Sequence, residues 1–243
     1  NQNRRRIEKE VVNEALKQID EKSYTNVVYG KDWNQGVLGI VASRIIEKSY
    51  KPTVVLTESN EDILTGSVRS VKDYDVYQSL SDCEANLLQY GGHKYAAGLK
   101  IKKSKFDTFK TQFENTVKNS VDQKMFNRVF SYDILIDFTK IKIENIKILS
   151  RMAPFGLGNS RPVFRTNNCY IDSKLKFIGR EQQIIKSKIK DKYGEQLPFI
   201  CFNKKTEITQ LSSPFDILYN LNINTFSGHE TIEINIREIF VKK

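Results

Sequence analysis

Apolar residues in the first half of the chain switch repeatedly between helical and strand-like spacing. In residues 3–22, apolar positions recur every three or four residues among charged ones, which predicts an amphipathic helix. The same period predicts helices over residues 37–50, 76–88 and 105–121. Short apolar runs between these helices predict strands over residues 26–29, 53–57, 63–70 and 96–101. This alternation indicates an α/β domain over residues 21–127, preceded by a separate helix over residues 1–20.

The pattern changes after about residue 127. Residues 132–138 alternate like a strand, and residues 143–152 have helical spacing. From residue 163 onward, turn residues separate short strands at near-regular spacing, which is typical of a small barrel or sandwich. The expected strands are 163–164, 169–171, 175–178, 183–189, 198–202, 215–223 and 231–240. The predicted fold class is therefore α/β (α+β): a mixed-sheet domain followed by a β-rich, barrel-like domain over residues 128–243.

Composition adds information about partners and surroundings. The chain has 39 Lys and Arg against 29 Asp and Glu, a net charge of +10, which favours a polyanionic partner. A basic, well-solvated surface would give the same charge, so charge alone does not decide between these alternatives. No apolar run is long enough for a transmembrane helix. The chain starts at Asn1, without a methionine or a secretory signal, which indicates an excised piece of a longer protein.

The three cysteines, Cys83, Cys169 and Cys201, are far apart, which argues against a disulfide framework or a structural zinc site. A reducing cytoplasm is the simpler location. With only two histidines, His93 and His229, the chain does not suffice for a histidine-rich metal site. We expect no metal ligands within it.

The sharpest motif is Gly-Gly-His-Lys-Tyr-Ala-Ala-Gly at residues 91–98. Gly91 and Gly92 permit positive φ angles and a close approach of a ligand to the backbone, and His93 follows as a hydrogen-bond donor to a phosphate oxygen. The alternative is a helix C-cap with a histidine in the turn.

A second motif, Gly-Ser-Val-Arg-Ser at residues 66–70, places an arginine between two hydroxyls at the end of a strand. Arg69 with Ser67 and Ser70 would form a phosphate clamp, because a guanidinium offers a bidentate fork. A solvent-exposed arginine is the alternative.

In the motif at residues 33–44, a glycine-bearing turn over residues 32–36 leads into the helix that carries Arg44, and a helix N-terminus attracts anions. For Trp33 and Val41 in this segment, a role in the core is favoured. The loop at residues 152–164, rich in glycine and proline, lacks the Gly-Lys-Ser/Thr of a P-loop, and we expect it to be structural.

Aromatic and basic residues interleave in the β-rich half, as in barrels that bind single strands. The basic candidates for nucleic-acid contact are Arg151, Arg161, Arg165, Lys186 and Lys188. His229 lies in an expected hairpin turn and is interpreted as solvent-exposed, not as a ligand.

Taken in order, these motifs resemble the RecJ family of the DHH phosphoesterase superfamily. Residues 3–10 (NRRRIEKE) resemble the helix that follows the catalytic domain of RecJ, and the motifs at 36–44, 66–70 and 91–98 resemble the DHH-associated domain. The loop at residues 153–159 resembles the entry to the oligonucleotide-binding barrel of RecJ. Gly-Gly-His also occurs in related nanoRNases and alanyl-tRNA synthetases, so the order of the motifs carries the resemblance.

The resemblance implies the substrate-binding part of a metal-dependent 5′-to-3′ exonuclease that acts on single-stranded DNA in repair and recombination. It implies Mn²⁺ or Mg²⁺ held by Asp and His residues of a domain that this chain lacks, so this chain alone would be inactive. His93 would lie beside the scissile phosphate, and Gly91 and Gly92 would shape its approach to that phosphate. Arg69, Ser67, Ser70 and, more weakly, Arg44 and Gln89 would hold nearby phosphates.

The expected partner is single-stranded DNA, with single-strand-binding protein or a helicase as further candidate partners. We expect the protein to be a cytoplasmic monomer that does not bind a membrane. Two alternatives stay open: a non-catalytic nucleic-acid-binding module, and a DHH-type hydrolase of short RNA or cyclic dinucleotides.

Overall fold

The computed structural model describes residues 2–121, 123–156, 158–179, 182–202, 208–211, 214–225 and 228–241. The chain divides into two compact units, residues 1–129 and 130–243, which are described separately. Both units contain the classes of element that the pattern of apolar residues predicts.

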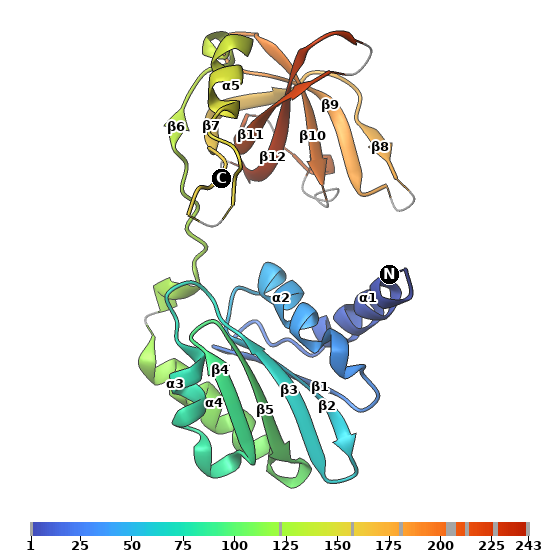
Figure 1. Cartoon of the computed structure of the whole chain (residues 1–243), viewed down its shortest axis with the longest axis vertical. Helices are drawn as coiled ribbons and strands as arrows, with labels where there is room; N and C mark the ends of the chain where they lie inside the picture. Colours follow the sequence, from blue (N-terminus) through green and yellow to red (C-terminus); the bar gives the residue numbers. More distant parts are fainter. Residues whose placement is uncertain are drawn as a thin grey trace. The chain divides into compact units, whose positions relative to one another are not determined.

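Unit 1 is a five-stranded mixed sheet in the order β1-β2-β3-β5-β4 (Figure 1). Only β1 and β2 are parallel, and the other pairs are antiparallel. The strands are β1 Asn26–Gly30, β2 Thr53–Asn60, β3 Ile63–Arg69, β4 Gln89–His93 and β5 Ala96–Lys102.

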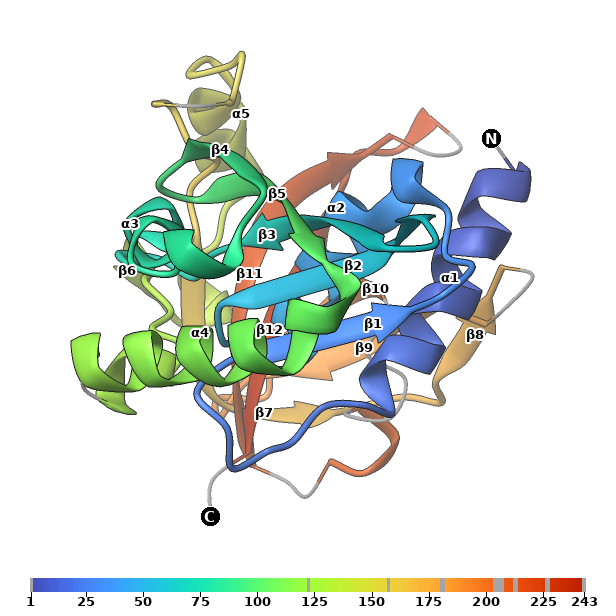
Figure 2. The same cartoon turned by 90° about the horizontal axis from the view of Figure 1, so that it is seen from below.

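Helices pack on both faces of this sheet (Figure 2). On one face, α1 (Gln2–Leu16) and α2 (Leu38–Lys48) bury a cluster that includes Val28, Val41 and Val55. On the other face, α3 (Val76–Ser81) and α4 (Phe106–Ser120) bury a larger cluster around Phe109 and Phe113. The first pair of helices packs against β1, β2 and β3, so the same face of β5 and β4 keeps exposed residues.

Some predicted elements of unit 1 differ from those in the structure. The first helix ends at Leu16, where residues 3–22 were expected, and the helix expected over residues 76–88 ends at Ser81. A 3-10 turn, Glu84–Asn86, follows, and then β4 begins at Gln89. The C-cap interpretation of Gly91 and Gly92 is therefore wrong, as is the turn expected there, because pairing with β5 draws both glycines into a strand.

Unit 2 is a β-barrel built from one sheet in the order β6-β7-β11-β12-β10-β9-β8. An additional pairing of β7 with β9 closes five of these strands into a ring, and β10 and β12 pair in parallel. Five strands in this arrangement are typical of an oligonucleotide-binding fold. The strands are β6 Ile134–Leu135, β7 Phe164–Ile171, β8 Lys176–Ile178, β9 Ile184–Lys190, β10 Gln196–Phe202, β11 Phe215–Asn224 and β12 Thr231–Val241.

The core of the barrel is aromatic and aliphatic, with Phe199, Phe215 and Tyr219 fully buried. Two predictions need correction here. The strand expected over residues 132–138 shrinks to two residues, and the two strands expected at 163–164 and 169–171 are one continuous strand, β7. The helix α5, Ile143–Ser150, precedes β7 as predicted.

Candidate nucleic-acid interface

His93 and Arg69 lie on the same face of the sheet in unit 1. Arg69 on β3 pairs with Ala96 on β5, and Ala96 pairs with His93 on β4. Directly paired residues of antiparallel strands point to the same side, so the imidazole and the guanidinium share a face. Two strand spacings separate their backbones by about 10 Å. Both side chains can therefore reach a single strand of nucleic acid laid across the sheet.

The next row inward on this face consists of Ser67, Gly98 and Gly91, one from each of the same three strands. This face carries no helix at β4 and β5, and Gly91, His93 and Gly98 are all exposed. We call this face of β3, β5 and β4, which is open over β5 and β4, the glycine shelf. Its floor is backbone, so a ligand can approach N–H and C=O groups closely.

Gly92 has a different role from Gly91. Its φ is +146°, and a Cβ there would lie 2.4 Å from the carbonyl oxygen of Ala96 and 2.5 Å from Ala97 Cα. A side chain at this position is excluded by the fold itself. At Gly91, a Cβ would meet no atom within 4 Å. The absence of a side chain at Gly92 therefore lets β4 pair with β5 at the end that carries His93.

A pocket of about 500 Å³ adjoins the shelf where α2 begins. Ser67 and Arg69 line it from β3, Gly39 and Arg44 line it from α2, and Gly36 lines it from the 3-10 turn before α2. A Cβ at Gly39 would lie 2.5 Å from a terminal nitrogen of Arg69, so the missing side chain makes room for the guanidinium. The structure thus brings together residues from two motifs that are about thirty positions apart in the sequence.

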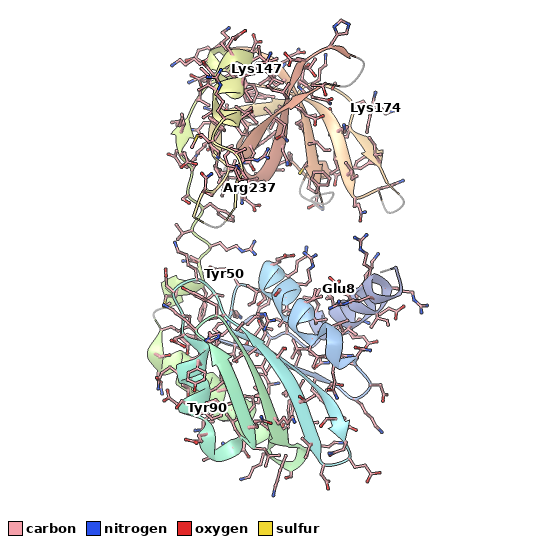
Figure 3. The ribbon with its side chains drawn as sticks, viewed as in Figure 1. Glu8, Tyr50, Tyr90, Lys147, Lys174 and Arg237 are labelled. Carbon is pink, nitrogen blue, oxygen red and sulfur yellow. The ribbon has the colours of Figure 1, made fainter. Side chains whose placement is uncertain are left out.

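The cations of this pocket differ in how they are bound. Arg44 donates from Nη1 to both carboxylate oxygens of Glu47 at 3.0 Å, and from Nε to Glu8 of α1 at 3.2 Å; Glu8 is labelled in Figure 3. The hydrogen bond to Glu47 and then that to Glu8 raise the pKa of Arg44. Two carboxylates therefore offset its charge. Arg69 instead donates to the backbone carbonyl of Val68 at 2.8 Å, and no carboxylate of the described residues pairs with it.

Arg4 of α1 also lines the pocket and donates to the carbonyl of Gly36 at 3.1 Å. Sequence reasoning missed Arg4 as a candidate, because only the packing of α1 beside α2 brings it to the site. The run of three arginines at residues 4–6 was the available signal.

Ser67 lines the pocket beside α2, whereas Ser70 does not. Its hydroxyl donates to the carbonyl of Tyr74 at 2.8 Å, and its N–H donates to the carbonyl of Tyr95 at 3.0 Å. These bonds hold the loop that follows β3. Trp33 and Val41, the latter on α2, are buried in the core between the sheet and the helices α1 and α2, which confirms the structural role expected for them.

No group of three His, Cys, Asp or Glu side chains within the described ranges is close enough to hold a metal ion. Arginine, serine and a lone histidine are a donor set suited to phosphate, whereas Mg²⁺ and Mn²⁺ require carboxylates. The residues of this site therefore fit an anion and do not fit a divalent metal.

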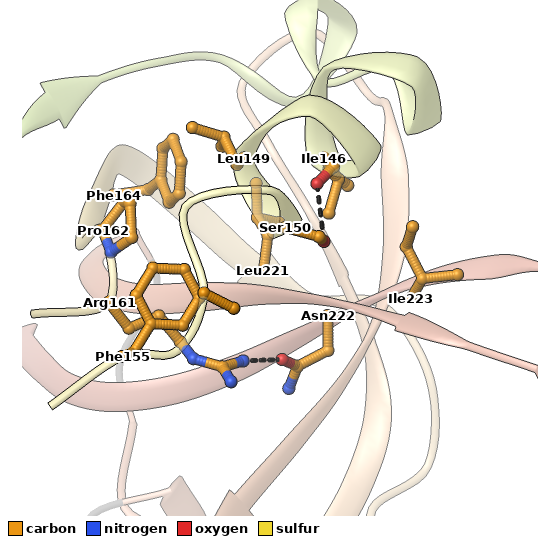
Figure 4. A pocket seen from close by; sticks show the side chains of 11 residues that line it. Ile146, Leu149, Ser150, Phe155, Arg161, Pro162, Phe164, Leu221, Asn222 and Ile223 are labelled. Atoms are coloured by element: carbon orange, nitrogen blue, oxygen red, sulfur yellow. Dashed lines mark hydrogen bonds between the residues drawn. The ribbon is translucent and has the colours of Figure 1, made fainter.

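In unit 2, a pocket of about 290 Å³ lies between α5, the loop after it and β11 (Figure 4). Its walls are mostly apolar, with Phe155, Phe164 and Leu221 among the lining residues. Arg161 extends over the ring of Phe155, 5.2 Å from its centroid, and donates to Asn222. The side chain of Asn159 holds this loop by donating hydrogen bonds to the carbonyls of Met152 and Pro154. These two bonds support the structural role expected for the loop.

The other basic candidates of unit 2 fall into two groups. Arg165 forms an ion pair with the buried Asp216 at 2.8 Å, and it also donates to Asn167. Lys186 and Lys188 alternate with buried isoleucines on β9, so both point outward from the barrel. Lys186 pairs with Glu233 at 3.4 Å, whereas Lys188 is exposed.

The remaining basic candidate, Arg151, caps α5 and is exposed. Next to the lysines of β9, on β10, Phe202 is 45% exposed and available for stacking. His229 is exposed in the connection between β11 and β12, as expected.

Comparison with known proteins agrees with this architecture. Residues 21–119 match the DHHA1 domain family, and residues 132–238 match the RecJ OB domain family. This is a RecJ-like chain. It covers the DHHA1 and OB domains of that family, which confirms both the resemblance and the fold class predicted from the motifs.

Relatives of this RecJ-like chain are longer. The single-stranded-DNA-specific exonuclease RecJ of Haemophilus influenzae is 30% identical over 96% of this chain, which aligns with 43% of that protein. The protein of the same name from Bacillus subtilis is 27% identical over 100% of this chain and 31% of its own length. The crystal structure of Thermus thermophilus RecJ in complex with Mg²⁺ shares the fold, with a TM-score of 0.80 at 23% identity over 99% of this chain and 36% of that one. The chain thus spans less than half the length of these relatives. No helix in the described part of the chain is long and apolar enough to cross a membrane.

Proposed function

We propose that this RecJ-like chain is the strand-binding part of a metal-dependent 5′-to-3′ exonuclease that acts on single-stranded DNA in repair and recombination. The observation that carries the proposal is the shared row of Arg69 and His93 on an open sheet face. Relatives named as single-stranded-DNA-specific exonucleases support it over the full length of the chain. The direction of cleavage rests on the family resemblance.

Each residue of the shelf has a chemical task in this proposal. His93 donates a hydrogen bond to a non-bridging oxygen of the scissile phosphate, where negative charge grows during hydrolysis. Arg69 and the hydroxyl of Ser67 hold a neighbouring phosphate, and Gly91 lets the strand lie against the backbone. Gly92 sets the position of His93 through its contact with β5. Arg44 is bound by Glu8 and Glu47 and Ser70 by its own loop, so both serve to shape the site.

The metal belongs outside this chain in the proposal. Mn²⁺ or Mg²⁺, bound by carboxylates and histidines of another part of the protein, would supply the activated water and offset charge on the phosphate. The task of the present residues is to bind and orient the strand, which is why this chain alone is expected to be inactive.

The barrel supplies a second contact. The outer faces of β9 and β10 carry Lys186, Lys188 and the exposed ring of Phe202, and in oligonucleotide-binding folds the strands in these positions bind nucleic acid. Lysines follow the phosphates, and the ring stacks on a base. Arg165 is not part of this surface, because it forms an ion pair with the buried Asp216.

The test uses the longer protein that contains this chain, with Mn²⁺ or Mg²⁺ and a single-stranded oligonucleotide. We expect His93→Ala to lower kcat by about 10²–10³-fold, as for the loss of one transition-state hydrogen bond, with a far smaller change in binding. His229→Ala is the matched control, because it removes the other histidine from an exposed turn. Unchanged turnover in His93→Ala would remove the catalytic role of this histidine. Binding without degradation by the unmodified protein would favour the non-catalytic module.

A further inference from the structure

Two glycines on the shelf are not required by the fold. Gly91 and Gly98 face each other across β4 and β5, and neither has a φ in the left-handed region. A Cβ at Gly91 would meet nothing within 4 Å, and at Gly98 the nearest atom would be the carbonyl oxygen of Gly66 at 3.7 Å, an ordinary contact. Glycine weakens a strand, so its presence twice in one row calls for another reason.

The missing side chains leave a hollow of about 340 Å³ above the sheet. Gly91 and Gly98 form its floor. Thr65, Gln89 and Lys100, which form the next row across the same three strands, supply its polar groups. The residues that line it include no carboxylate. The hollow therefore carries one positive charge and several hydrogen-bonding groups, which suit an anionic ligand that has hydrogen-bonding groups of its own.

The position of the hollow relates it to the proposed phosphate site. Successive rows on one face of an antiparallel sheet are about 7 Å apart, because each row advances by two residues. The row of Arg69 and His93, the glycine row and the row of Lys100 thus follow one another at a spacing comparable to one nucleotide of an extended strand. A strand held at His93 and running along β5 would pass directly over the hollow.

We propose that this hollow is a nucleotide subsite that takes the sugar and phosphate of the residue next to the one at His93. The sugar lies on the backbone of Gly91 and Gly98. The ammonium of Lys100 binds the phosphodiester, with the Thr65 hydroxyl and the Gln89 amide as further hydrogen-bonding groups. This inference rests on the proposed function, because it assumes that a nucleic-acid strand occupies the shelf.

The experiment is an NMR titration of the 243-residue chain with a thymidine tetranucleotide. Local dissociation constants are taken from the backbone amides of unit 1, so binding to the barrel does not hide them. We expect the amides of Gly91, Gly98 and Lys100 to shift in the unmodified chain. Gly98→Val fills the hollow and should weaken this local affinity by about tenfold, or about 1.4 kcal/mol.

Lys100→Gln should weaken local affinity by about fivefold, within the range for an exposed ion pair. It should also reduce the slope of log affinity against log salt by about 0.7, the value for one phosphate contact on a single strand. Lys110→Gln is the matched control. Lys110 is an exposed lysine on α4, the helix on the opposite face of the sheet, so it should leave both quantities unchanged.

The variants separate the possible outcomes. If Arg69→Gln weakens binding while Gly98→Val and Lys100→Gln bind normally, the subsite is wrong and the proposed function stands. If the amides of unit 1 do not shift with the tetranucleotide, both fail. If only the hollow variants weaken binding, the subsite is supported and the role of Arg69 is lost. Trp33 fluorescence monitors folding, and Gly98→Ala, which adds one methyl group, replaces Gly98→Val if the valine disturbs the sheet.

Discussion

Replacing each glycine of the Gly91-Gly92 pair by alanine separates a requirement of the fold from a requirement of the ligand. At Gly92, the backbone has a φ of +146°, and an added Cβ would lie 2.4 Å from Ala96 O and 2.5 Å from Ala97 Cα. At Gly91, the same methyl group has open space. The two neighbouring substitutions are chemically identical, so any difference in stability comes from local geometry.

The expected magnitude follows from two costs at Gly92. An unfavourable φ costs about 1–3 kcal/mol, and forcing packed atoms apart typically costs about 1–3 kcal/mol more. Gly92→Ala should therefore lower the free energy of unfolding of unit 1 by about 2–6 kcal/mol. Gly91→Ala should change it by no more than about 0.5 kcal/mol, as is usual for a surface position.

The assay is urea denaturation followed by tryptophan fluorescence. Trp33 is the only tryptophan of the chain, and it is 7% exposed in the core of unit 1, so its emission reports this unit and not the barrel. Gly92→Ala should lower the midpoint without changing the slope. Equal stability of the two variants would refute the argument that the contact with Ala96 and Ala97 fixes the end of β4.

Two further predictions concern ionisable groups in the cores. Burial, reinforced by the hydrogen bond to Glu58, raises the pKa of Tyr29 to about 12. Its absorbance at 295 nm should therefore titrate at a higher pH than that of ordinary tyrosines. The stability due to the neutral form of Tyr29 is present below pH 10 and is lost as the pH rises through about 12. Tyr29→Phe should remove one tyrosine from the late-titrating group, in which Tyr219 remains because burial also raises its pKa. An unchanged amplitude of the late step in Tyr29→Phe would contradict the prediction. Burial raises the pKa of the Cys83 thiol to about 11, and Cys169 and Cys201 are also fully buried, so Ellman's reagent should react with native protein only as fast as it unfolds. Rapid reaction of one thiol in the folded chain would show that its burial is wrong.

The strongly periodic segments could be predicted from the sequence because burial of one face constrains their residues directly. Phe109, Phe113 and Val117 recur along one side of α4, and all three are fully buried in the structure. Weak or short segments could not be predicted as well. Residues 84–93 follow a helix and contain two glycines, yet they form a 3-10 turn and an edge strand. Hydrogen bonds to β5, which no local pattern encodes, determine that outcome.

By itself, the sequence determined the two classes of domain, their order, and the motifs that point to phosphate. These follow from local residue choice: apolar period, turn residues, and the chemistry of arginine, serine and histidine. Tertiary structure alone decided which motif residues meet. Arg69 and His93 share a row because β5 lies between β3 and β4, whereas Arg44 is drawn to Glu8 and Glu47. Strand register and helix packing depend on contacts between distant segments, and that is the physical reason why they had to come from the folded chain.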